Sequence, residues 1–137
     1  MAGPGRPADG RVLEAIGEFV RSLQARKMSP HTIAGYERDL RTVAELAAAR
    51  AGVPLSDLEV QALGGRLMRA AFAEFSAPRS AASVNRAWSA WNRFLTFCVA
   101  EGLLEGNPMA AVPRPRQPAR APKPLLGEGD AAGTLLE

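Results

Sequence analysis

Six of the eleven prolines in this 137-residue chain fall between Pro108 and Pro124. Proline lacks a backbone N–H and has a fixed φ, so this stretch is predicted to be extended rather than helical. The preceding hundred residues contain few helix breakers. They show no period-two alternation of β-branched residues, whereas apolar residues recur with the 3.6-residue spacing of helices. The chain is therefore predicted to be all-α.

Four amphipathic helices are expected, over residues 11–26, 30–50, 60–75 and 80–101. Asp9 is the expected N-cap of the first helix, and Ser29 followed by Pro30 starts the second. Gly52 and Pro54 end the second helix, and Gly102 ends the fourth. The pair Gly64-Gly65 falls inside the third helix and is expected to cost about 1 kcal/mol per glycine relative to alanine. The third helix is therefore the weakest of the four and could be bent.

Each helix has a predicted apolar face. These faces are Val12, Ile16, Phe19, Val20 and Leu23 on the first helix; Ile33, Tyr36, Leu40, Val43 and Ala47 on the second; Leu63, Leu67, Ala71 and Phe75 on the third; and Val84, Trp88, Trp91, Leu95 and Val99 on the fourth. Tyr36 lies in the middle of its stripe, which indicates a core residue rather than a nucleophile. Cys98, at the edge of the fourth face, is expected to be a small core residue.

The side chains available for chemistry are few, because the chain has one Cys, one His and one Tyr. They cannot build a disulfide framework or a Cys/His zinc site within one chain. No apolar run approaches the length of a membrane span, the start does not resemble a signal peptide, and no glycine-rich phosphate loop or paired-carboxylate motif is present. We therefore expect a cytoplasmic protein with no cofactor, no metal, no membrane contact and no small-molecule substrate, and no enzymatic activity of its own.

Basic residues are concentrated in two places. Residues 106–127 carry four basic residues and no acid. Arg79, just ahead of the fourth helix, and Arg86 and Arg93 on it recur at seven-residue intervals with no acid between them. Arginine and serine on one helix face suit the major groove of DNA, where arginine binds guanine or phosphate. The two helix starts Ser29-Pro30-His31-Thr32 and Ala77-Pro78-Arg79-Ser80 combine free N–H groups, hydroxyls and a basic side chain, which is a phosphate-binding arrangement.

Two simpler interpretations stay open. The arginines could form a solvated face in a protein from an arginine-rich proteome, since the chain has 15 Arg and 2 Lys. The proline-rich segment could likewise be a solvated tail rather than a strap along a polyanion.

Several short motifs together resemble the N-terminal core-binding domain of tyrosine recombinases of the phage-integrase and Xer type. The matching residues, in chain order, are Ser29-Pro30-His31-Thr32, Tyr36, Asp39-Leu40, Pro78-Arg79-Ser80, Asn85-Arg86, Phe94-Leu95, Glu101-Gly102-Leu103-Leu104, Asn107-Pro108 and Lys123-Pro124-Leu125. The resemblance covers about residues 12–125. It implies a SAM-like, small orthogonal bundle of four to five helices, followed by a Pro/Arg-rich extended linker.

The resemblance also implies a domain organisation. We expect a disordered N-terminus over 1–10, the helical DNA-binding domain over 11–112 and the basic linker over 113–127. Residues 128–137 would be either the start of a missing catalytic domain or a disordered tail. The family cleaves DNA with a C-terminal Tyr nucleophile and an Arg, Lys and His set, and no Tyr, His or Arg follows Lys123. The chain alone is therefore expected to bind DNA without cutting it.

The expected partner is double-stranded DNA, gripped in the major groove at a recombination half-site, with other recombinase protomers as further candidate partners. The predicted DNA-binding residues are Ser29, His31, Thr32 and Arg38 of the second helix; Arg79, Ser80, Ser83, Arg86, Ser89 and Arg93 at the fourth; and Arg114, Arg116, Arg120 and Lys123 of the linker. The alternative function is a helical protein interaction module that binds an acidic partner.

Overall fold

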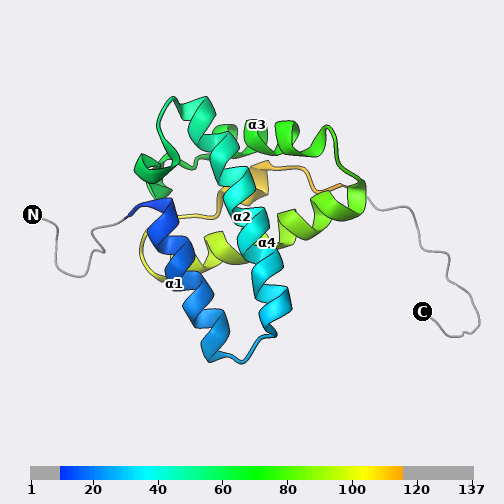
Figure 1. The fold of residues 1–137 in the computed structure, drawn as a ribbon. Helices are drawn as coiled ribbons and strands as arrows, with labels where there is room; N and C mark the ends of the chain where they lie inside the picture. The colour runs from blue at the N-terminus through cyan, green and yellow to red at the C-terminus, as the bar shows by residue number, and fades with distance from the viewer. Residues whose placement is uncertain (1–9, 116–137) are drawn as a thin grey trace, which may run out of the picture.

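The computed structural model describes residues 10–115, and the described part of the chain contains helices and no strand (Figure 1). The elements are α1 (Val12–Ala25), α2 (Pro30–Ala51), η1 (Leu55–Asp57), η2 (Val60–Ala62), α3 (Gly65–Ser76), α4 (Ala81–Ala100) and η3 (Pro108–Ala111), where η denotes a short 3-10 helix. The predicted all-α fold is confirmed.

The α2 helix is the centre of the bundle, because it packs against α1, α3 and α4. In Figure 1, α1 and α2 form an antiparallel pair in front, and α4 passes behind α2. The aromatic centre of the core joins α1 to α4: Phe94 packs edge-on against Phe19 at 5.6 Å and against Trp91 at 5.4 Å between ring centroids. This packing fixes which side of α4 faces outward.

The starts and ends of α2 and α4 agree with the sequence prediction. The Ser29 hydroxyl accepts a hydrogen bond from the Thr32 backbone N–H at 3.2 Å, and the Ser80 hydroxyl accepts one from the Ser83 N–H at 3.2 Å. Gly52, with φ +77°, ends α2, and Gly102, with φ +80°, follows the end of α4. Both glycines occupy the left-handed region, where a side chain would be strained.

The start of α1 differs from the prediction. Arg11 is the N-cap and makes no side-chain cap hydrogen bond, and Asp9 lies outside the described residues. The first turn is held instead by the segment before α3. The Val12 N–H donates to the Leu58 carbonyl at 2.8 Å, and the Val60 N–H donates to the Gly10 carbonyl at 2.6 Å.

The prediction that Gly64-Gly65 weakens the interior of the third helix is wrong. Residues 60–62 form the separate helix η2, and α3 begins only at Gly65, with Gly64 as its N-cap. The two glycines therefore start the helix rather than interrupt it. The buried face of α3 is Met68, Ala71, Phe72 and Phe75. Leu67, which was predicted for this face, is only partly buried.

The buried face of α4 is rotated from the predicted stripe. Trp88 and Val99 are only half-buried, and the buried residues are Val84, Ala87, Ala90, Trp91, Phe94, Leu95 and Cys98. Tyr36 of α2 is likewise only partly buried against the core rather than central in it. The periodicity located both faces to within one or two residues, but partners distant in the sequence decide which edge is covered.

The expectation that the proline-rich segment contains no helix is wrong for its first residues. Pro108–Ala111 form the 3-10 helix η3, because Pro108 stands in the first turn, where no backbone N–H is needed. Asn107 caps this helix by accepting the Met109 N–H at 2.8 Å, and Met109 is fully buried. The Trp88 indole N–H then donates to the Val112 carbonyl at 3.0 Å. Residues 107–112 thus close the bundle along α3 and α4.

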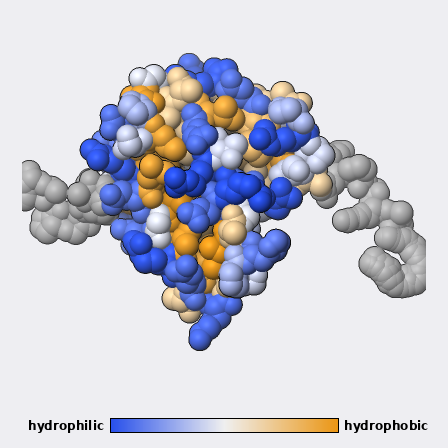
Figure 2. All heavy atoms as spheres, in the orientation of Figure 1, coloured by the Kyte–Doolittle hydropathy of each residue, from blue (hydrophilic) through white to orange (hydrophobic). Residues whose placement is uncertain are grey.

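The outer surface is mainly polar. Figure 2 shows hydrophilic residues over most of the visible face, with narrow hydrophobic strips between them. Val53 is the one large hydrophobic residue that is exposed in the described range. None of the helices in residues 10–115 combines the length and apolar character that a membrane crossing requires.

Gly65 is needed where η3 approaches α3. A Cβ built on Gly65 would lie 2.8 Å from the Ala111 Cβ, which is too close for two carbon atoms. We predict that Gly65→Ala lowers the free energy of unfolding by about 1–3 kcal/mol, as overpacking does, in urea denaturation. The double variant with Ala111→Gly should recover most of the loss, and Gly106→Ala, whose Cβ would meet nothing within 4 Å, is the control. A Gly65→Ala protein as stable as wild type would contradict this packing.

Cys98 is fully buried on α4, as predicted for a core residue. Burial, with smaller contributions from the Glu101 and Glu18 carboxylates, raises the pKa of its thiol from 9.0 to about 12. The thiolate is the reactive form, so we predict that native protein at pH 8 does not react with a thiol reagent and that urea-unfolded protein reacts with one equivalent. Because the unfolded chain loses this proton near pH 9 and the folded chain keeps it, stability should also fall between pH 9 and about 12, more than in Cys98→Ala. Rapid labelling of native protein would contradict the burial.

Candidate nucleic-acid interface

The structure places most of the predicted binding residues at the surface. Ser29, His31, Thr32, Arg38, Arg79, Ser80, Arg86, Arg93 and Arg114 are exposed, and Ser83 and Ser89 are half-buried. Arg116, Arg120 and Lys123 lie outside the described residues.

A surface pocket of about 330 Å³ joins the first turns of α2 to the second turn of α4. Its lining residues are His31, Thr32, Ala34, Gly35, Tyr36, Arg38 and Arg86. Ala34 and Gly35 have small side chains or none, so the pocket stays open between the two arginines. The structure therefore brings four predicted binding residues together, and it does not include Arg79, Ser80 or Ser83 in this group.

Asp39 lies between the two arginines of this pocket. It is 5% exposed and is the one charged residue buried within residues 10–115. Its Oδ2 accepts a hydrogen bond from the Arg86 Nε at 3.4 Å, and its Oδ1 lies 3.6 Å from the Arg38 Nε. The sequence shows no acid between the arginines of the fourth helix, but in the structure α2 supplies a carboxylate that pairs with Arg86.

Two further arginines lie over aromatic rings. The Arg93 guanidinium is 5.9 Å from the centre of the Tyr36 ring and donates to the Tyr36 hydroxyl at 3.2 Å. The Arg79 guanidinium is 4.0 Å from the centre of the Phe75 ring and donates to the Phe75 carbonyl at 2.7 Å. An aromatic face attracts a cation while leaving the charge uncancelled, so both side chains stay positive and gain a preferred direction.

Arg114 is held against α4 instead of extending away from it. Its Nε donates to Asn85 Oδ1 at 2.6 Å, one terminal nitrogen donates to the Ser89 hydroxyl at 2.9 Å, and its guanidinium lies 4.6 Å from the centre of the Trp88 ring. The Asn85 side-chain amide also donates to the Pro115 carbonyl at 3.0 Å. Ser89 is thus engaged by the chain itself.

The two helix starts keep part of the predicted phosphate-binding arrangement. Ser29 and Ser80 each use their hydroxyl as an N-cap, so in each helix one N–H of the first turn already has a partner. Each helix start therefore has one fewer free N–H group than the prediction assumed. The side chains of His31 and Thr32 remain exposed at the α2 start, beside the pocket.

Sequence reasoning missed three residues of this surface: Asp39, Asn85 and Trp88. Asp39 directly precedes Leu40 of the apolar stripe, and a carboxylate beside a buried stripe was the available signal of a buried ion pair. No comparable signal existed for Asn85 and Trp88, because their partners are Arg114 and Val112, more than twenty residues away. Among residues 10–115, no cluster of three or more His, Cys, Asp or Glu side chains could hold a metal ion.

Residues 16–102 match the family described as phage integrase, N-terminal SAM-like domain. The chain is also similar to proteins named tyrosine recombinase XerC. It is 33% identical over 116 residues to that of Neisseria meningitidis serogroup C (strain 053442), and 35% identical over 111 residues to that of Chromohalobacter salexigens. It is 29% identical over 136 residues to that of Xanthomonas campestris pv. campestris.

These alignments cover 80%, 81% and 98% of this chain, but only 36%, 36% and 39% of the respective relatives. The chain thus spans less than half the length of the curated relatives that it matches. No solved structure matches it.

Proposed function

Because this chain belongs to the phage integrase N-terminal SAM-like domain family, we propose that it is the DNA-binding module of a site-specific tyrosine recombinase. In this proposal, it grips one recombination half-site in the major groove with α2 and α4. Phosphate contacts position the module and contacts to base edges supply specificity.

The observation that carries the proposal is the pocket between α2 and α4. Arg38 and Arg86 both line it, and the buried carboxylate of Asp39 lies beneath them. Arg93 lies on the adjoining surface through its contact with Tyr36. A helical surface that carries these arginines, with the Asp39 carboxylate withdrawn into the core, favours a polyanion.

The proposed role is binding without strand cleavage. The chain has a single tyrosine, Tyr36, whose hydroxyl accepts a hydrogen bond from Arg93 and whose ring packs against the core. That tyrosine is thereby used to hold a binding residue. In a full recombinase the transesterification would fall to residues beyond this module.

We predict that the 137-residue chain binds a 30-base-pair duplex and that the affinity falls steeply with salt. A plot of log affinity against log salt, from fluorescence anisotropy titrations between 50 and 200 mM, should have a slope of about −3 or steeper, because each phosphate contact releases counterions. Arg93→Ala should make this slope shallower by about 1.

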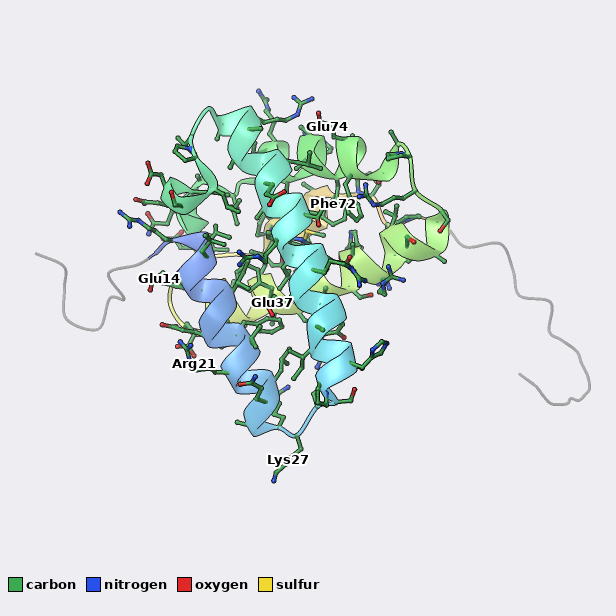
Figure 3. The ribbon with its side chains drawn as sticks, in the orientation of Figure 1. Glu14, Arg21, Lys27, Glu37, Phe72 and Glu74 are labelled. Atoms are coloured by element: carbon green, nitrogen blue, oxygen red, sulfur yellow. The ribbon has the colours of Figure 1, made fainter. Side chains whose placement is uncertain are left out.

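The matched control is Arg21→Ala, which removes the same charge from the outer side of α1, where Figure 3 shows the side chain pointing away from the bundle. Its titration should overlay that of wild type. If wild type fails to bind duplex DNA at 50 mM salt but binds an acidic polypeptide such as polyglutamate, the protein-interaction alternative replaces this proposal.

A further inference from the structure

Resting on the proposed function, we propose that Asp39 is a positioning residue that presents Arg86 to a base edge, and that Arg86 is the side chain of α4 that reads sequence. Arg79, Arg93 and Arg114, which lie at or against the same helix, would then bind backbone phosphate. This division follows from how each guanidinium is held.

The four arginines at or against α4 differ in which nitrogens the protein uses. Arg114 uses its Nε and one terminal nitrogen for Asn85 and Ser89, and Arg79 uses a terminal nitrogen for the Phe75 carbonyl. Arg93 uses a terminal nitrogen for Tyr36. Arg86 alone of these four is held through its Nε only, by Asp39 at 3.4 Å, within residues 10–115.

Within residues 10–115, the two terminal nitrogens of Arg86 make no hydrogen bond to the protein. A side-by-side pair of N–H donors matches the O6 and N7 acceptors of guanine in the major groove. Arg86 is 53% exposed at its side chain and lines the pocket, so a base edge can reach those nitrogens. Arg79 and Arg93 each donate to the protein through Nη1, so they keep only the Nε and Nη2 pair along the side of the guanidinium, whereas Arg86 keeps the Nη1 and Nη2 pair at its tip.

The position of Asp39 is set by the core. Its backbone carbonyl accepts the indole N–H of Trp91 at 3.4 Å, and Trp91 is fully buried. The carboxylate therefore sits on the same turn that locks α2 to α4, and it can hold Arg86 at a fixed height above the helix. An arginine without such a support samples many rotamers and binds any nearby phosphate.

The carboxylate also opposes DNA binding in general, because it places a negative charge beneath a surface that would face phosphates. If Asp39 both weakens non-specific attraction to DNA and fixes Arg86, two opposite effects are expected from its substitution. Removing its charge should strengthen binding to unrelated DNA and weaken discrimination. A merely structural residue would lower both affinities together.

The test compares wild type, Asp39→Asn, Arg86→Lys and Arg93→Lys. Each protein is used to enrich sequences from a randomised duplex pool, and its affinity is then measured for the wild-type consensus duplex and for a scrambled duplex. Wild type should enrich a G·C pair at one or more positions. Arg86→Lys and Asp39→Asn should lose that preference and lower the consensus-to-scrambled affinity ratio by about ten-fold.

Asp39→Asn should in addition bind the scrambled duplex more tightly than wild type does. Arg93→Lys is the matched control, since it keeps the charge of a neighbouring arginine on the same helix, and it should retain the consensus and the ratio. If thermal melting shows that Asp39→Asn does not fold, Arg86→Lys and Arg93→Lys together still decide whether Arg86 reads sequence.

The outcomes separate this inference from the function on which it rests. A wild-type protein that binds duplex DNA without enriching any sequence, or an Arg86→Lys variant that keeps the full ratio, overturns the inference and leaves DNA binding intact. An Asp39→Asn variant that folds and loses affinity equally for both duplexes also overturns it. A wild-type protein that binds no duplex removes both proposals.

Discussion

The close packing of α2 against three other helices is the constraint on which the rest of the structure depends. Its inner face ends in a run of small buried residues, Val43, Ala44, Ala47 and Ala48, so neighbouring helices can approach its backbone closely. The α4 helix contributes Ala87 and Ala90 to the same interior. In a bundle this small, such an approach leaves little room to rotate either helix, and the outward-facing residues of α2 and α4 are fixed relative to each other. The pocket between them is a product of that packing.

The segment after α4 also packs against the bundle and helps to define the surface of α4. Gly65 allows η3 to lie against the start of α3, and Asn107 ties this segment to α4 by donating to the Asn92 side chain at 2.8 Å and to the Thr96 hydroxyl at 3.2 Å. Trp88 is partly buried against the core and also contacts Val112 and Arg114. The exposed face of α4 that carries Arg86 and Arg93 is therefore bounded on one side by residues 107–115. On the other side it is bounded by Asp39 and Tyr36 of α2.

The predictable features are those whose causes are local. Ser29 and Ser80 start helices, and Gly52 and Gly102 stop them, through contacts within a few residues, so the sequence alone indicated both helices. Sequence alone also grouped His31 and Arg86 as surface residues. It could not place Gly65, because its role depends on Ala111, and it could not find the partner of Arg86, because Asp39 is 47 residues away. Periodicity describes one helix at a time, whereas the rotation of a helix is decided by what covers it.

The point at which the described chain ends bears on how the basic segment would act. Asn85 holds the Pro115 carbonyl and the Arg114 guanidinium, so the chain leaves the bundle beside the exposed face of α4 rather than from the opposite side. A segment that starts next to a binding surface has a high effective concentration at whatever that surface binds. Arg116, Arg120 and Lys123 follow within eight residues of Pro115. If α4 binds DNA, any contact made by these cations would add to the affinity without a separate encounter. Anchoring Arg114 and Pro115 on α4 would thus couple the basic segment to that helical surface.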